Sequence, residues 1–114
     1  MSRLSVVVPV FDEKETLEEL HRRVGEVLDR LSGGPHQLVL VDDGSSDGSA
    51  ALLDALARRS DRLLVVHLSR NFGHQAAIAA GIDHASGDWI AVMDGDLQDP
   101  PEEIPRLLEK ALEG

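Results

Sequence analysis

The sequence has no cysteine and few aromatic residues, one tryptophan and two phenylalanines among 114 residues. Without cysteine, disulfide bonds, zinc–thiolate sites and cysteine nucleophiles are excluded. Basic residues are also scarce, because 11 Lys and Arg stand against 21 Asp and Glu, which gives a net charge of -10. This balance excludes a basic surface for a nucleic-acid backbone. An acidic protein can still bind a diphosphate through a divalent cation, so the charge favours a metal-dependent site.

Long apolar runs are absent as well. No segment approaches the ~20 apolar residues of a membrane span. The run from Leu4 to Phe11 is too short for a secretory signal and is predicted to be a strand. We expect one domain over residues 1–114, located in the cytoplasm or, in a longer enzyme, at the cytoplasmic face of the membrane. The five histidines show no metal-binding spacing and are expected to be surface or packing residues.

What the sequence does contain is an alternation of short β-branched runs with longer segments of helical period, which is typical of βαβ units around a parallel sheet. Strands are predicted at 4–10, 37–42, 63–68 and 89–94, each buried on both faces. Helices are predicted from a capping box of Asp12 and Glu15 to Gly33, at 48–59, at 74–85, and from Pro101 to the end at Gly114. The fourth helix repeats apolar residues at Ile104, Leu107, Leu108, Ala111 and Leu112.

In such folds, ligands bind outside the carboxyl ends of the strands. The loops at that edge are FDEKE, DDGSSDGS, SRNFGHQ and DGDLQDPP, and three of them are rich in carboxylates or amides.

The segment VMDGDLQDPP is the strongest candidate for chemistry. Asp94 and Asp96 stand two residues apart after an apolar strand, so their carboxylates can point to the same side. Mg²⁺ or Mn²⁺ would relieve their repulsion and accept phosphate oxygens, and Gln98 offers a carbonyl oxygen nearby. The alternative is a plain Asp-Gly-Asp turn followed by Asp99 as a helix cap.

The other loops allow two interpretations each. Asp42 and Asp43 can accept hydrogen bonds from a base or a ribose, or belong to a βα loop in which Ser46 or Asp47 caps the next helix. Asp12 and Glu13 are explained as helix-start acids, which disfavours phosphate at that loop. In the third loop, Arg70 can meet a diphosphate or pair with an Asp, and the amides after Gly73 can face an anion.

Four segments of the chain together resemble, in order and spacing, the family 2 glycosyltransferases: SVVVPVFDE, LVLVDDGSSDGS, LSRNFGHQAAIAAG and DGDLQDPPE. Within that family they resemble the polyprenyl-phosphate group, which includes dolichol-phosphate mannose synthases. The resemblance covers the whole chain and implies a Rossmann-like GT-A fold whose first half binds a nucleoside diphosphate sugar. It implies inverting sugar transfer to a lipid phosphate.

The resemblance also assigns residues. Asp94 and Asp96 would be the catalytic DxD pair and, with Gln98, the ligands of Mg²⁺ or Mn²⁺. Pro9, Phe11 and Glu13 would line the nucleoside pocket, and Asp42 would contact the base. The full set of candidate nucleotide-sugar contacts is Pro9, Val10, Phe11, Glu13, Asp42, Asp43, Arg70, Gly73, Gln75, Asp94, Gly95 and Asp96.

The chain departs from this family by ending after the DxD helix, so we expect only the donor-binding half and a self-associating homo-oligomer with an exposed strand edge. One alternative is a non-catalytic nucleotide-sugar or metal-binding module that needs a partner chain. A phosphoacceptor receiver domain is disfavoured, because its acid pair would follow the first strand. A nucleotidyltransferase is disfavoured, because FDEKE is not a glycine-rich basic loop.

Overall fold

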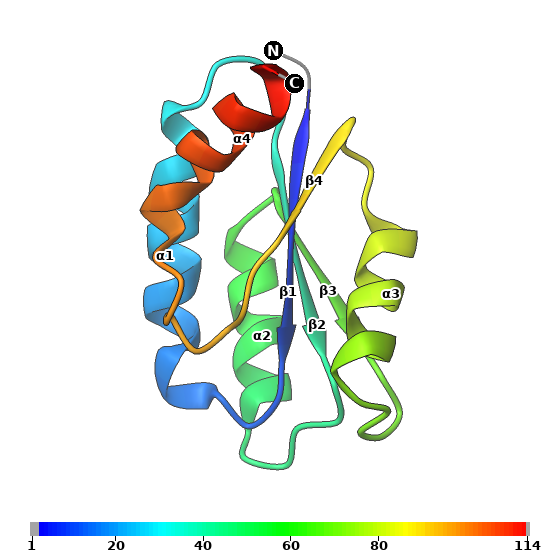
Figure 1. Cartoon of the computed structure of the whole chain (residues 1–114). Coiled ribbons are helices and arrows are strands. Elements are labelled where there is room, and N and C mark those ends of the chain that lie inside the picture. Colours follow the sequence, from blue (N-terminus) through cyan, green and yellow to red (C-terminus); the bar gives the residue numbers. More distant parts are fainter. Residues whose placement is uncertain (1–2, 114) are drawn as a thin grey trace.

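Residues 3–113, which the computed structural model describes, form four parallel strands that alternate with four α-helices (Figure 1). The strands are β1 (Leu4–Val10), β2 (Gln37–Asp42), β3 (Leu63–His67) and β4 (Trp89–Val92). The helices are α1 (Lys14–Arg30), α2 (Ser49–Arg59), α3 (His74–His84) and α4 (Ile104–Glu113), with a 3-10 turn η1 (Pro101–Glu103) before α4. The predicted α/β alternation is confirmed, although β3 ends one residue early and β4 two residues early. The predicted end of the last helix at Gly114 lies outside the described residues.

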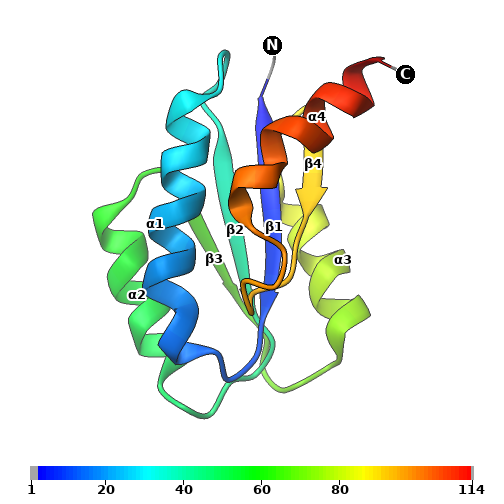
Figure 2. The ribbon, with the colours of Figure 1, turned by 60° about the vertical axis from the view of Figure 1, so that its left-hand side comes forward.

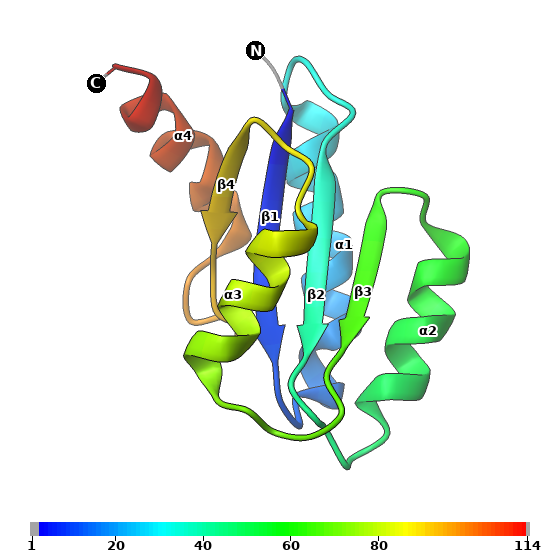
Figure 3. The ribbon, with the colours of Figure 1, turned by 90° about the vertical axis from the view of Figure 1, so that its right-hand side faces the viewer.

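The sheet has the strand order β3-β2-β1-β4. From β1 the chain winds outward through β2 to β3, then returns over the other face to add β4 beside β1, so the winding reverses at β1. Helices α1 and α2 cover one face of the sheet and α3 covers the other (Figures 1 and 3). This reversal is where open α/β sheets place their ligand sites.

Side-chain alternation along the central strands divides the core in two. Val6, Val8 and Leu40 belong to the larger cluster beneath α1 and α2, while Val7 and Val41 pack with Ala77 of α3. All five strand residues are fully buried. Each such side chain contributes roughly 1.5–3 kcal/mol on burial, so the two central strands supply much of the stabilisation of the sheet.

Helix α3 lies very close to the sheet, as its alanine-rich sequence predicts. The closest point is Gly81, where an added Cβ would lie 2.9 Å from Cγ2 of Val41 and closer still to Cγ1 of Val7. Only a residue without a side chain fits there, so Gly81 determines how near α3 approaches the strands.

Two burial predictions are wrong. The two edge strands are not buried on both faces: β3 is buried only at Leu63, and β4 exposes Trp89, Ile90 and Val92. In α4, only Ile104 and Leu108 of the predicted apolar stripe are buried. Leu107 remains 60% exposed: α4 packs on η1, and it is η1 that contacts α1. Within residues 3–113, no helix combines the length and apolar content that crossing a bilayer requires.

Candidate functional site

The loops that follow the four strands meet at one end of the molecule (Figure 2). The first and second loops are joined by hydrogen bonds from the backbone N–H of Asp12 to Oγ of Ser45, 2.9 Å, and from the N–H of Ser46 to Oδ1 of Asp12, 2.8 Å. The third and fourth loops approach each other where Nε2 of His74 lies 3.5 Å from Oδ1 of Asp94. The loops that the sequence predicts to meet at the carboxyl ends of the strands are therefore in contact in pairs.

A pocket of about 210 Å³ opens among these loops. It is lined by Pro9, Val10, Phe11, Glu13, Asp43, Asn71, Gly73 and His74. A larger hollow of about 790 Å³ lies at the opposite edge of the sheet, where Arg3 and Arg62 already donate to protein oxygens. Because the smaller pocket lies where the winding reverses and contains the candidate polar groups, we take it as the ligand site.

Asp42 and Asp43 point to opposite faces of the sheet, because successive strand residues alternate. Oδ1 of Asp43 accepts the N–H of Phe72 at 2.9 Å, and Asp43 lines the pocket on the α3 side. Oδ2 of Asp42 faces Nδ1 of His67 at 3.1 Å, and its Oδ1 accepts the N–H of Ser45 at 2.9 Å. Asp42 is only 3% exposed and both its oxygens have protein partners, so the carboxylate that faces the pocket is that of Asp43.

Gly44 brings the second and third loops together. Its φ is +77°, and a Cβ there would lie 2.9 Å from Cα of Arg70 and closer still to the peptide bond between Arg70 and Asn71. A side chain is therefore excluded on two grounds, conformation and space. The glycine lets the chain around Asn71 reach the pocket.

Glu13 and Gly95 join the first and fourth loops. A Cβ on Gly95 would lie 3.1 Å from Oε1 of Glu13 and 3.2 Å from the carbonyl oxygen of Pro9, so the DGD segment lies directly against the pocket. The hydroxyl of Thr16 donates to the carbonyl oxygens of Glu13 and Gly95, at 3.0 and 3.1 Å. These contacts hold the backbone between the two aspartates.

The acidic character of this corner is reflected in Glu13. Burial raises the pKa of its carboxyl group, the hydrogen bond from the N–H of Phe11 opposes that rise, and the negative charges of Asp96, Asp94 and Asp47 add to it. Negative charge is therefore concentrated between Glu13 and the DGD segment, as expected of a place that attracts a cation.

The DGD segment is both a turn and a pair of available carboxylates. Oδ1 of Asp96 accepts the N–H of Gln98 at 3.1 Å, and Leu97 has a φ of +64°. The segment therefore forms the turn that the alternative interpretation predicted. Asp94 and Asp96 are nevertheless exposed. Asp99 does not cap the next helix, since Pro100 occupies that position.

Within residues 3–113, no three His, Cys, Asp or Glu side chains form a ready-made metal cage. The two exposed carboxylates of Asp94 and Asp96 nevertheless fit Mg²⁺ or Mn²⁺, which keep water molecules as further ligands. Oxygen donors without sulfur also match the preference of these hard cations.

Three further residues with predicted roles, Asp12, Arg70 and Gln75, have other surroundings than the sequence suggested. Asp12 does not form a capping box with Glu15: its φ is +50°, its carboxylate is used by Ser46, and Glu13 occupies the N-cap position of α1. The guanidinium of Arg70 stacks on Phe72, 4.6 Å from the ring centre, instead of pairing with an aspartate. Gln75 is exposed on the first turn of α3 and does not line the pocket.

Sequence reasoning missed four residues of this region: Thr16, His67, Asn71 and His74. Asn71 stood in a loop already singled out, so its position was the available signal. His67 and His74 are predicted from the sequence to be packing or surface residues. Their contacts with aspartates could not be predicted, because these aspartates belong to other elements of the fold.

Comparison with known proteins identifies the family of the chain. The family model described as glycosyl transferase family 2 matches residues 5–114. The undecaprenyl-phosphate 4-deoxy-4-formamido-L-arabinose transferases of Salmonella paratyphi B and Salmonella newport are each 48% identical over 115 residues, which cover 100% of this chain and 35% of theirs. The chain therefore spans about a third of the length of the curated relatives it matches.

Solved structures show the same fold. The mannosyltransferase PcManGT from Pyrobaculum calidifontis, in complex with GDP-Man and Mn²⁺, superimposes with a TM-score of 0.79 at 23% identity, covering 97% of this chain and 32% of that one. S. aureus TarS 1-349 in complex with UDP-GlcNAc gives 0.71 at 20% identity, covering 97% and 31%. The fold is the Rossmann-like GT-A architecture of glycosyltransferases. The chain belongs to glycosyltransferase family 2, which removes the receiver-domain and nucleotidyltransferase alternatives.

Proposed function

We propose that this chain is the donor-binding part of a metal-dependent glycosyltransferase, in which the pocket holds a nucleoside diphosphate sugar. The observation that carries the proposal is the contact between two features: a pocket containing the buried carboxylate of Asp43, and the exposed Asp94 and Asp96 directly beside it. The first can recognise a nucleoside and the second can bind a metal diphosphate.

The nucleoside end is assigned to the pocket. Asp43 is 4% exposed and uses one oxygen on the N–H of Phe72, so its other oxygen can accept a hydrogen bond from a base N–H or a ribose hydroxyl. Pro9, Val10 and Phe11 supply apolar contact from the end of β1. Asp42 supports this arrangement from the other face of the sheet and does not touch the ligand.

The diphosphate end is assigned to the DGD segment. Mg²⁺ or Mn²⁺, held there by Asp94 and Asp96 with Gln98 assisting, would neutralise the departing diphosphate. The N-terminus of α3, which begins at the pocket after Gly73, presents backbone N–H groups that favour negative charge. Arg70 remains a candidate phosphate contact if its guanidinium leaves Phe72.

The names of the relatives support a polyprenyl-phosphate acceptor. The transfer we propose is inverting, as the resemblance to the polyprenyl-phosphate group implies. PcManGT is described with GDP-Man and Mn²⁺, and TarS with UDP-GlcNAc, which supports a nucleotide-sugar donor with a divalent cation. An acceptor phosphate is already ionised at neutral pH, so this chemistry requires no side-chain base.

Isothermal titration calorimetry tests the proposal. UDP, GDP and UDP-glucose are titrated into the chain with Mn²⁺ or with chelator, for wild type, Asp96→Asn and the control Asp61→Asn, whose side chain is exposed in the turn between α2 and β3. We expect metal-dependent binding of one nucleotide, lost in Asp96→Asn and retained in Asp61→Asn.

Absence of binding to all three by folded wild type would contradict the proposal. Metal-dependent binding without sugar transfer to a polyprenyl phosphate would instead support a binding module that needs a partner chain.

A further inference from the structure

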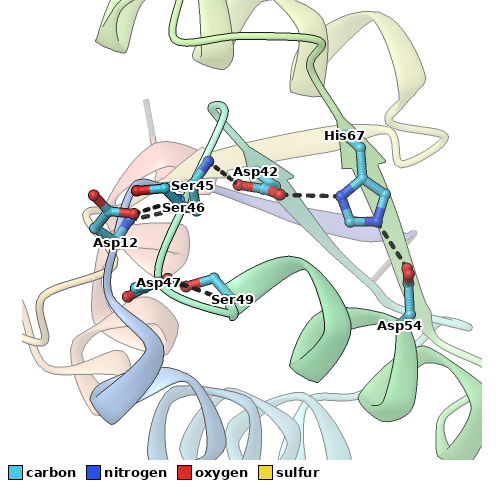
Figure 4. A network of polar contacts seen from close by, with 8 residues as sticks. All are labelled: Asp12, Asp42, Ser45, Ser46, Asp47, Ser49, Asp54 and His67. Carbon is cyan, nitrogen blue, oxygen red and sulfur yellow. Dashed lines mark hydrogen bonds and ion pairs between the residues drawn. The ribbon is translucent and has the colours of Figure 1, made fainter.

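His67 stands between two carboxylates of different elements. It is the last residue of β3, with Nδ1 3.1 Å from Oδ2 of Asp42 in β2 and Nε2 2.7 Å from Oδ1 of Asp54 in α2 (Figure 4). A neutral imidazole carries one N–H and could donate to only one of these oxygens, whereas the imidazolium donates to both. The geometry therefore suits the protonated ring.

The pKa of His67 moves in the corresponding direction. The hydrogen bond to Asp54 raises it most, the partial burial of the ring opposes the rise, and the hydrogen bond to Asp42 adds to it. The charged groups that act on the ring are therefore Asp54 from α2 and Asp42 from β2.

Asp42 transmits this contact to the loop beside the pocket. Its carboxylate is almost fully buried, and a buried carboxylate is costly unless its oxygens are paired. One oxygen faces His67 and the other accepts the N–H of Ser45, whose hydroxyl in turn accepts the N–H of Asp12. A chain of polar contacts thus runs from α2 through the ends of β3 and β2 to the loop after β1 (Figure 4).

Asp43 follows Asp42 directly, so whatever fixes the backbone of Asp42 also fixes the direction of the carboxylate that faces the pocket. The carbonyl oxygen of Asp42 also accepts the N–H of Leu68 at 2.9 Å, one residue beyond His67. The end of β3 is thus joined to Asp42 through the side chain of His67 and the backbone of Leu68, and neither His67 nor Asp42 lines the pocket.

We infer that His67 is a positioning residue for the nucleotide pocket, acting with Asp54 through Asp42. The inference deepens the proposed function and rests on it. His67 holds the buried carboxylate of Asp42, which keeps the turn at Ser45 closed and Asp43 directed at the nucleoside.

The test uses the variants His67→Gln, Asp54→Asn and Asp54→Glu and the double variant of His67→Gln with Asp54→Asn. His84→Gln is the matched control. His84 is exposed at the end of α3 and its Nδ1 faces only the carbonyl oxygen of Ala80 in the same helix. Two quantities are measured: the calorimetric Kd for the nucleotide in Mn²⁺, and the rates of amide hydrogen exchange at Ser45 and at Val39 in the buried part of β2.

We expect His67→Gln to weaken nucleotide binding about tenfold, because a buried carboxylate loses a charged partner. Exchange should accelerate more at Ser45 than at Val39, because Val39 reports only the change in global stability. Asp54→Asn should give a smaller loss, Asp54→Glu should restore most of the affinity, and the double variant should bind no more weakly than His67→Gln. His84→Gln should match wild type.

Unchanged affinity and unchanged Ser45 exchange in His67→Gln would overturn the inference. Equal acceleration at Ser45 and Val39 would also overturn it, because His67 would then serve only global stability. Failure of wild type to bind UDP or GDP overturns the proposed function first and the inference with it, so the two failures are distinguished by the wild-type titration.

Discussion

The carboxylates of Asp42 and Asp43 are neighbours in sequence and lie on opposite faces of the sheet. Asp42 turns toward His67 and the α2 side, and Asp43 turns toward the pocket and α3. The two residues therefore have different partners. Substitution of Asp43 should affect binding with little effect on stability, whereas substitution of Asp42 should lower stability and weaken binding only through the turn at Ser45.

Asp43→Asn should weaken nucleotide binding by at least about tenfold and change stability little, because an amide oxygen can still accept the N–H of Phe72 while the negative charge toward the ligand is lost. Asp42→Asn should lower the free energy of unfolding by about 1–3 kcal/mol, because His67 loses its buried carboxylate partner. Chemical denaturation and calorimetry measure the two effects. The reverse pattern, with Asp42→Asn abolishing binding in a protein of full stability, would contradict this assignment.

Stability should depend on pH through His67. Its pKa is raised above the ordinary value of 6.5, chiefly by Asp54 and then by Asp42, so the folded protein keeps a proton that the unfolded chain loses. The stabilisation is therefore complete below about pH 6.5 and is lost as the pH rises through the folded pKa. The difference in Tm between wild type and His67→Gln should be largest at low pH and should shrink at alkaline pH.

Comparing the two proteins at the same pH cancels the contributions of the other titrating groups, including His21. The pKa of His21 is lowered, chiefly by burial and further by the charges of Arg59 and Arg62. A difference in Tm that grows toward alkaline pH would show that the imidazolium does not contribute.

Two glycines in helices should respond in opposite directions to alanine. Gly81→Ala should lower the free energy of unfolding by about 1–3 kcal/mol, because its Cβ would overlap Val7 and Val41. Gly25→Ala in α1 should raise it by up to about 1 kcal/mol, because nothing lies within 4 Å of the added Cβ and alanine favours the helix. Urea denaturation of both variants measures the contrast. Equal effects would show that α3 can move away from the sheet without cost.

The exposed edge at β4 should make the chain self-associate. Ile90 is 42% and Val92 46% exposed on a strand with a free hydrogen-bonding edge within the described part of the chain. Sedimentation velocity should show association that increases with concentration and weakens in Val92→Lys. Ala111→Lys on α4, also exposed, is the matched charge control. A monomer at all concentrations would contradict the prediction.

The sequence predicted the elements well because their signals are local. The runs of Leu4–Val10 and Gln37–Asp42 are strands as expected, and the apolar period of α1 is buried as expected. The meeting of the four loops at one end of the sheet was also predicted correctly, because parallel strands bring their carboxyl ends together.

What the sequence did not predict depends on partners far along the chain. The partners of His67 lie 25 and 13 residues before it in the sequence. Asp12 does not cap α1, and its carboxylate accepts a backbone N–H 34 residues away. Strand alternation predicts that the side chains of Asp42 and Asp43 point to opposite faces of the sheet. It does not predict which of the two faces the pocket, because the apolar run before them is buried on both faces. Exposure of β4 depends on strand order, which short apolar runs do not encode.

The close approach of Gly81 to the sheet has a consequence at the other end of its helix. Because Gly81 and the pocket residues Gly73 and His74 stand on or next to the same helix, the distance between Gly81 and the sheet also bears on how far Gly73 and His74 lie from Asp43 and Pro9 across the pocket. A bulkier residue at position 81 would move the helix away from the sheet and widen the pocket without altering any group that lines it. The width of the proposed nucleotide pocket therefore depends on a residue inside the hydrophobic core.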